Sequence, residues 1–220
     1  MHPVRLDTPS GLIGGYRADP HNEPRGGIVV VQEIFGVNRH IRSVVDRFAA
    51  HGFIAIAPCL FDHFGAGIEL DYDEAGIANG RERVAELGFD RAVVDVEAAA
   101  KSLSGSVDKV GVVGYCWGGT IAFLANTRLG LPAASYYGGR TVPFLHERPR
   151  APLMLHFGER DPLIPPEHIQ AHRDALAGAH IHVYDAGHGF NCDQRADYDE
   201  SAAQEAFQRT LRFFEKVLHP

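Results

Sequence analysis

A cysteine at position 116 stands in a setting typical of a nucleophile. The segment 110–120 reads VGVVGYCWGGT: an apolar run, then Gly-x-Cys-x-Gly, then the start of a helical segment. In a nucleophile elbow the central residue lies on a strained turn between strand and helix, and glycines flank it because a Cβ there would collide with neighbouring backbone. The turn places the sulfur at a helix N-terminus, whose free N–H groups favour a thiolate and later an oxyanion. The short pattern also fits a buried cysteine in a tight turn. Catalytic partners elsewhere in the chain are needed to distinguish a nucleophile from such a structural cysteine.

Both partners that a nucleophilic cysteine needs follow Cys116 in the chain. Asp161 comes after the apolar run 153–157, and His188 comes after the run 181–184. Nucleophile, acid, histidine is the order in α/β-hydrolases, where acid and histidine each lie in a loop after a later strand. Alone, Asp161 reads as a turn residue before a proline and His188 as a solvated loop histidine. In this order the three residues predict a catalytic triad.

The electrostatics of such a triad give each residue a role. Asp161 would accept from Nδ1–H of His188 and fix its tautomer, while the other ring nitrogen faces the sulfur of Cys116. Attack on an acyl carbon creates an oxyanion that needs N–H donors. We expect one donor to be the backbone N–H of Trp117, directly after the nucleophile, and the other to come from the loop at residues 31–36.

The elements that must position these residues alternate along the chain. Short β-branched runs between segments of helical period predict an α/β fold, a mainly parallel twisted sheet with helices on both faces. Predicted strands cover residues 28–31, 53–57, 109–113, 133–137, 153–157 and 181–184, and predicted helices about 38–51, 90–103, 118–129, 166–177 and 198–218. Residues 4–13 suggest an N-terminal hairpin or edge strands, and the glycine- and acid-rich residues 60–80 a long surface excursion. No linker or repeat divides the chain, so residues 1–220 are expected to form one domain.

The composition narrows the classes of function. The chain has 220 residues with 45% apolar and 22% charged side chains, which is ordinary for a globular domain and unlike disordered or fibrous proteins. A net charge of −7 without any basic run gives no electrostatic footprint for nucleic acid. The longest apolar runs are about half of the ~20 residues that a bilayer span needs, and the first twenty residues lack a secretory pattern, so we expect a cytoplasmic protein without a membrane partner. The wide spacing of Cys59, Cys116 and Cys192 argues against a disulfide framework.

Metal and nucleotide cofactors have little support in the sequence. His168 and His172 could share one helix face, and His180 and His182 one strand face, but neither pair has an obvious third ligand. Solvated surfaces explain both pairs. The glycine motifs that cradle phosphates are missing, so we expect no cofactor.

Taken together, the motifs resemble the dienelactone hydrolase family, the carboxymethylenebutenolidases, which are cysteine-nucleophile members of the α/β-hydrolase fold. The similarity extends over almost the whole chain. It is carried by QEIFG at 32–36, GYCWGG at 114–119, YYG at 136–138, the turn 158–161, GHGF at 187–190 and the helical segment 206–214. The resemblance implies the triad Cys116, Asp161 and His188, with the backbone N–H groups of Ile34 and Trp117 as oxyanion donors.

The resemblance gives Glu33 a further role: it holds the resting thiol until substrate displaces it. This has independent physical sense, because a carboxylate close to a thiol makes the thiolate more costly. Without the resemblance, Glu33 would be read as a solvated acidic residue at a strand end.

Substrate contacts carry over from the family less fully. Phe35 and Tyr137 match positions that line the pocket, although either could be a core aromatic. Two arginines bind a substrate carboxylate in the family, and Arg81 is the preferred candidate for the first. Cys192 and Asp193 stand in the neighbourhood where the second is expected, and the nearest basic residue is Arg195, so this arginine clamp is either absent or rebuilt.

The expected function is cofactor-independent hydrolysis of a small ester or lactone through a thioester, since the chain leaves little material for a lid domain. A broader carboxylesterase or thioesterase would use the same residues on another substrate. A catalytically silent member would bind a ligand without turnover, and an amidotransferase-like cysteine elbow would give His188 no role. The expected partner is a small-molecule substrate, and the protein itself is expected to be a monomer or a small homo-oligomer.

Overall fold

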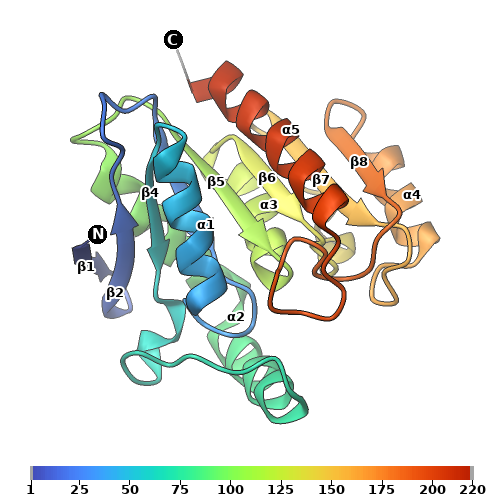
Figure 1. The fold of residues 1–220 in the computed structure, drawn as a ribbon, viewed down its shortest axis with the longest axis horizontal. Coiled ribbons are helices and arrows are strands. Elements are labelled where there is room, and N and C mark those ends of the chain that lie inside the picture. Colours follow the sequence, from blue (N-terminus) through green and yellow to red (C-terminus); the bar gives the residue numbers. More distant parts are fainter. Residues whose placement is uncertain (1, 219–220) are drawn as a thin grey trace.

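Eight strands form one sheet in the computed structural model, which describes residues 2–218 (Figure 1). The strands are β1 (His2–Thr8), β2 (Gly11–Ala18), β3 (Gly27–Val31), β4 (Ile54–Pro58), β5 (Val110–Tyr115), β6 (Ala133–Tyr136), β7 (Leu153–Gly158) and β8 (His180–Tyr184). Their order is β1-β2-β4-β3-β5-β6-β7-β8, with β3 to β8 parallel and β1 and β2 an antiparallel hairpin at one edge. The predicted mainly parallel sheet with an N-terminal hairpin is confirmed.

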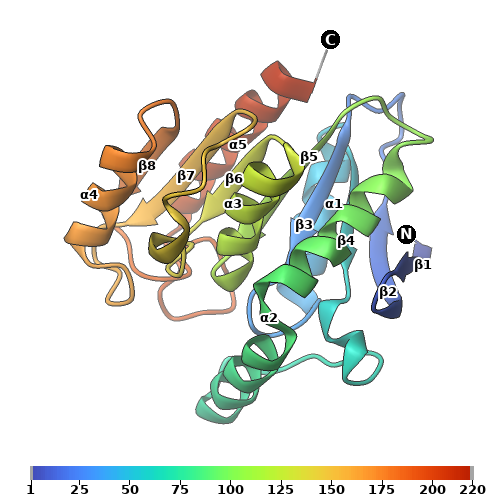
Figure 2. The same cartoon turned by 180° about the vertical axis from the view of Figure 1, so that it is seen from behind.

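Helices cover both faces of this sheet, which explains why β3 is an unbroken apolar run that is buried throughout. On one face lie α1 (Arg39–Ala50) and α5 (Glu200–Leu218), and on the other α3 (Trp117–Leu129) and part of α2 (Glu74–Leu103) (Figures 1 and 2). The helix α4 (Pro166–Ala175) lies beside the β8 edge (Figure 2). The start of α1 is fixed by Asn38, whose side chain accepts from the N–H of Ile41 at 3.2 Å.

The segment between β4 and β5 differs from the prediction. The helix expected at 90–103 is only the second half of α2, which begins at Glu74 and is interrupted at Gly88, where φ is 72° and ψ is 166°. The irregular excursion is therefore shorter, residues 59–73, and contains the 3-10 turn η1 (Leu60–His63); a second such turn, η2 (Val142–Phe144), follows β6. The first half of α2 was missed because it contains two glycines, Gly76 and Gly80, and glycine is a poor helix former. Packing requires one of these glycines: a Cβ at Gly80 would lie 2.2 Å from the carbonyl oxygen of Ile34.

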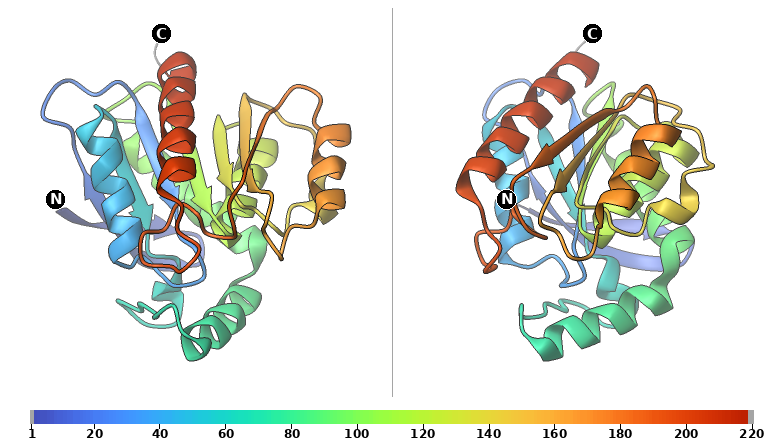
Figure 3. Two further views of the ribbon diagram at one scale, coloured as in Figure 1. Left: turned by 45° about the vertical axis from the view of Figure 1, so that its right-hand side comes forward. Right: turned by 90° about the vertical axis from the view of Figure 1, so that its right-hand side faces the viewer.

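The carboxyl ends of the parallel strands share one edge of the sheet, and the loops that leave them carry the candidate residues. The neighbours β3 and β5 lead to Glu33 and Cys116, while β7 and β8 lead to Asp161 and His188. Figure 3 shows the excursion and the first half of α2 projecting beyond this edge. Within residues 2–218, no helix is both long and apolar enough to cross a membrane.

Candidate active site

Cys116 occupies the strained turn that its sequence motif predicts. It lies between β5 and α3 with φ 55° and ψ −119°, a conformation that is unusual for any residue with a Cβ. The flanking glycines are sterically required: a Cβ at Gly114 would lie 1.8 Å from the carbonyl oxygen of Gly118, and one at Gly118 would lie 2.3 Å from that of Gln32. The close approach lets the loop after β3 lie against the N-terminus of α3.

A single imidazole links the three candidate triad residues. Nδ1 of His188 lies 2.7 Å from Oδ2 of Asp161, and Nε2 of the same ring lies 3.2 Å from Sγ of Cys116. Asp161 and His188 are buried, whereas Cys116 is partly exposed and accessible to a ligand. The carboxylate also accepts from the N–H of Leu163 at 2.8 Å, which fixes its orientation.

The surroundings of His188 favour its protonated form. Burial alone lowers the pKa of the imidazole, but the nearby Cys116 sulfur and the hydrogen bond to Asp161 outweigh it and raise the pKa to about 10. Burial raises the pKa of the other two thiols, Cys59 and Cys192, to about 12. Cys116 is the one thiol of the three with a contact to a base.

Ile34 and Trp117 line the same cavity as Cys116, and each has a backbone N–H group without a partner in the surrounding secondary structure. Trp117 is the first residue of α3, so its N–H has no partner within the helix, and the N–H of Ile34 has no acceptor among residues 2–218. The peptide that carries the Ile34 N–H is held from its other side: Nε2 of the buried Gln32 donates to the carbonyl oxygen of Glu33 at 3.2 Å. This contact of Gln32 was not foreseen from the sequence, where the residue is simply one of the QEIFG motif.

A cavity of about 520 Å³ opens over the sulfur, a size suited to a small molecule. Its lining residues are Ile34, Phe35, Ile77, Arg81, Cys116, Trp117, Gly139, Arg140, Pro162, Leu163, His188, Arg195 and Asp197. Phe35 and Arg81 were predicted from the sequence as substrate contacts, whereas Arg140 was not. Tyr137 is not in the lining: it is buried with its ring 5.2 Å from that of His188, so its role as a substrate contact stays a prediction.

The carboxylate of Glu33 is buried and paired with groups other than the thiol. Oε1 lies 3.3 Å from Nη1 of Arg195, and Oε2 accepts from the hydroxyl of Tyr72 at 3.0 Å. The loop after His188 thus returns an arginine to the cavity, although Cys192 stands where the sequence suggested one. Tyr72 was missed because it lies in the segment interpreted as a surface excursion. The single clue was that this aromatic residue stands between Asp71 and Asp73.

One group of metal-ligand types is present in residues 2–218: donor atoms of Glu33, His40 and Cys192 lie within 4.8 Å of one another. The charge of Glu33 is already balanced by Arg195, and the Cys192 thiol donates to the hydroxyl of Tyr72 at 3.3 Å. Hydrogen bonds therefore account for Glu33 and Cys192, whereas Nε2 of the buried His40 has no hydrogen-bond partner among residues 2–218. The expectation that the protein needs no metal stays a prediction.

Comparison with known proteins identifies the family to which the chain belongs. A Yersinia pestis protein provisionally named carboxymethylenebutenolidase is 36% identical over 219 residues, covering 90% of this chain and 80% of its own. Carboxymethylenebutenolidase 1 of Cupriavidus pinatubonensis is 30% identical, covering 96% and 94%. The crystal structure of a provisionally named dienelactone hydrolase from Klebsiella pneumoniae superposes with a TM-score of 0.87 at 30% identity, covering 97% of both chains. Residues 13–218 match the dienelactone hydrolase family as a whole. The chain thus belongs to the dienelactone hydrolase family and is a dienelactone hydrolase-like ester hydrolase.

Proposed function

We propose that this hydrolase cleaves small esters or lactones through a thioester on Cys116. The observation that carries the proposal is the His188 ring, which contacts Asp161 at 2.7 Å and the Cys116 sulfur at 3.2 Å under an open cavity. A neighbouring histidine with an elevated pKa favours a thiolate paired with an imidazolium. The contact also speaks against an amidotransferase-like site, in which His188 would have no role.

The reaction proceeds in two steps. The thiolate attacks the acyl carbon, the C–S bond forms, and the oxyanion accepts from the N–H groups of Ile34 and Trp117. Collapse of this intermediate breaks the C–O bond, and the leaving alkoxide takes the proton from Nε2 of His188. The now neutral imidazole removes a proton from water as the water oxygen attacks the thioester. The C–S bond then breaks and frees the thiolate of Cys116 and a carboxylic acid, which loses its proton to solvent and leaves as the carboxylate. From a lactone the product is a single hydroxy acid.

The arginines of the cavity favour a substrate that carries a carboxylate. Arg81 and Arg140 have no carboxylate partner within 4.0 Å among residues 2–218, although the protein carries a net charge of −7. Phe35 and Trp117 supply apolar wall around them. A broader carboxylesterase or thioesterase remains the second candidate, because this apolar wall would accept neutral acyl groups equally well.

The test combines nucleophile variants with trapping of the acyl-enzyme. We expect Cys116→Ala to abolish hydrolysis of 4-nitrophenyl acetate and of simple lactones, and Cys116→Ser to retain the fold with a large loss of rate. Rapid quenching and mass spectrometry should find the acetyl group on the peptide that contains Cys116. Cys59→Ser is the matched control and should behave as the parent. A Cys116→Ala variant with parental activity would refute the proposal.

Substrate class is tested separately. Arg81→Gln should raise KM for an ester that bears a carboxylate and leave neutral 4-nitrophenyl esters unaffected. Equal effects on charged and neutral esters would instead favour the broader esterase. A protein that binds such ligands without turning any over would be the silent member of the family.

A further inference from the structure

The position of the Glu33 carboxylate depends on groups supplied by other parts of the chain. The side chain is fully buried, and a buried carboxylate is stable only when charged or hydrogen-bonding partners compensate its lost hydration. Two partners are present, Arg195 at 3.3 Å and the Tyr72 hydroxyl at 3.0 Å. The Tyr72 hydroxyl is an uncharged donor, and its neighbours determine the direction in which its O–H points.

The hydroxyl of Tyr72 has only one free direction for its proton. Its oxygen accepts from Nδ2 of Asn38 at 2.9 Å and from the thiol of Cys192 at 3.3 Å. Oδ1 of Asn38 already accepts from the N–H of Ile41 at the start of α1, so the amide must turn its NH₂ to Tyr72. Burial keeps the Cys192 thiol protonated by raising its pKa to about 12, so it too donates. With both lone pairs filled, the hydroxyl is committed to donating to Glu33.

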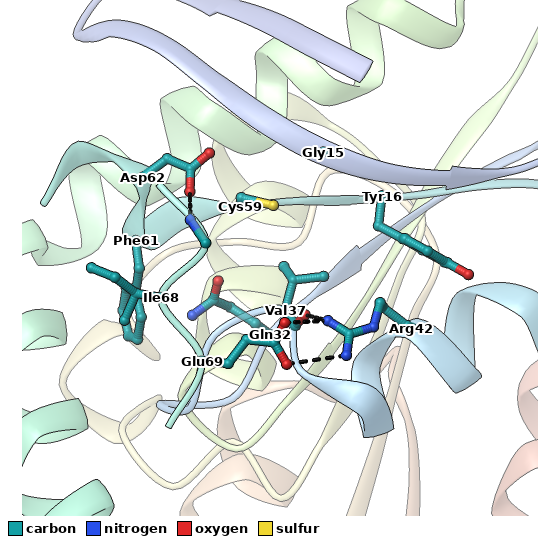
Figure 4. A pocket seen from close by; sticks show the side chains of 11 residues that line it. Gly15, Tyr16, Gln32, Val37, Arg42, Cys59, Phe61, Asp62, Ile68 and Glu69 are labelled. Atoms are coloured by element: carbon teal, nitrogen blue, oxygen red, sulfur yellow. Dashed lines mark hydrogen bonds and ion pairs between the residues drawn. The ribbon is translucent and has the colours of Figure 1, made fainter. Parts of the chain in front are cut away.

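The backbone around Tyr72 is held against the loop that carries Glu33. The N–H of Leu70 donates to the carbonyl oxygen of Phe35 at 2.9 Å, and the Tyr72 ring lies 4.4 Å from the ring of Phe35. Farther back, Glu69 accepts from Nη2 of Arg42 at 3.1 Å, on the wall of a separate cavity of about 220 Å³ between the excursion, β2 and α1 (Figure 4). Ring, hydroxyl and backbone are thus all fixed.

We infer that Tyr72 is a positioning residue that holds the Glu33 carboxylate on Arg195 and away from Cys116, so that the thiol ionises against His188. The inference rests on the proposed function. It differs from a purely substrate-driven displacement of Glu33, because the protein itself supplies the competing contact. Loss of one hydrogen bond to a carboxylate shifts such an equilibrium about tenfold, and a carboxylate that returns to the sulfur suppresses the thiolate.

The experiment measures the thiolate directly. The rate of Cys116 alkylation by iodoacetamide, followed by peptide mass spectrometry, is recorded against pH without substrate for the parent and Tyr72→Phe. We expect Tyr72→Phe to alkylate about tenfold more slowly at neutral pH, with a pH profile shifted upward, since one hydrogen bond to a charged group is lost. The phenylalanine keeps the ring contact with Phe35, and thermal unfolding checks that the fold is intact. The exposed Tyr198 provides the control, Tyr198→Phe, which should match the parent.

A double variant separates electrostatics from packing. Adding Glu33→Gln to Tyr72→Phe removes the returning charge and should restore parental alkylation, whereas a packing defect would persist. Parental reactivity of Tyr72→Phe alone, or failure of the double variant to recover, would overturn the inference while leaving the proposed function standing. If Cys116 of the parent reacts no faster than Cys59, the proposed function fails and the inference fails with it.

Discussion

Nε2 of His188 lies 3.2 Å from Sγ of Cys116, close enough that the proton affinity of each group depends on the charge of the other. The contact exists only while the sulfur is free. Once the sulfur is acylated it carries no charge, and the influence that raises the pKa of His188 is lost. The same imidazole can therefore hold a proton before acylation and accept one from water afterwards.

The pH dependence of acylation follows from this pair. The pKa of His188 is raised to about 10, so the imidazolium persists below that pH and is lost above it. For an alkyl ester, whose alkoxide needs a proton to leave, we expect kcat/KM to fall as pH rises through about 10. A 4-nitrophenyl ester has a stable leaving group and should lack this alkaline limb.

Replacing Asp161 should move that limb. Asp161→Asn removes a carboxylate that favours the imidazolium, so the limb for the alkyl ester should shift to lower pH by about one unit. Profiles of kcat/KM for both esters measure the shift. An unmoved limb in Asp161→Asn would contradict the assignment of the limb to His188.

Gln32 offers a test of the oxyanion site that leaves the triad intact. Its amide donates to the carbonyl of the peptide whose N–H belongs to Ile34, which orients and polarises that donor. Gln32→Leu should lower kcat about tenfold with little change in KM, a part of what loss of a whole oxyanion donor costs. Gln208→Leu, at an exposed position on α5, is the control. A fall in stability with kcat unchanged would mean that Gln32 acts only in packing.

Close packing at the elbow predicts a severe effect of one methyl group. In Gly118→Ala the new Cβ would lie 2.3 Å from the carbonyl oxygen of Gln32 and 2.6 Å from that of Val31, so backbone must move. We expect the free energy of unfolding to fall by about 2–3 kcal/mol and hydrolysis to be lost. Gly105→Ala places its Cβ in open space and should change stability by less than about 0.5 kcal/mol. Urea unfolding of the two variants makes the comparison.

A buried pair outside the active site ties η1 to α2. Nε2 of His63 lies 2.8 Å from Oδ2 of Asp95, and both side chains are almost fully buried. Asp95→Ala leaves the imidazole without its partner and should lower the free energy of unfolding by about 3 kcal/mol. Asp90→Ala breaks the exposed contact with Arg128 and should cost less than about 1 kcal/mol. Equal values from urea unfolding would show that the buried pair is no stronger than an exposed one.

Local pattern was enough to predict the elements that hold the nucleophile. A few consecutive residues are sufficient to recognise the apolar strands β3 and β5 and the helix cap at Asn38. The order Cys116, Asp161, His188 then placed three side chains on one edge, where the structure brings them into contact.

The contacts of Glu33 could not be predicted in the same way. Its partners Tyr72 and Arg195 are 39 and 162 residues away in the chain, and the clue to each was weak. Helix propensity also misled at the first half of α2, because Gly80 is there to let the helix approach the carbonyl of Ile34. Contacts between residues so far apart in the chain cannot be predicted from local propensity.

Gly88 divides α2 into two parts that contact different regions of the protein. The part after Gly88 packs against the sheet, whereas the part before it sends Ile77 and Arg81 into the cavity over Cys116. A change in the length or angle of the earlier part would reshape the wall that meets a substrate and leave the register of the strands untouched. The range of substrates can therefore change when the part of α2 before Gly88 changes, while the residues around Cys116 that carry the reaction stay the same.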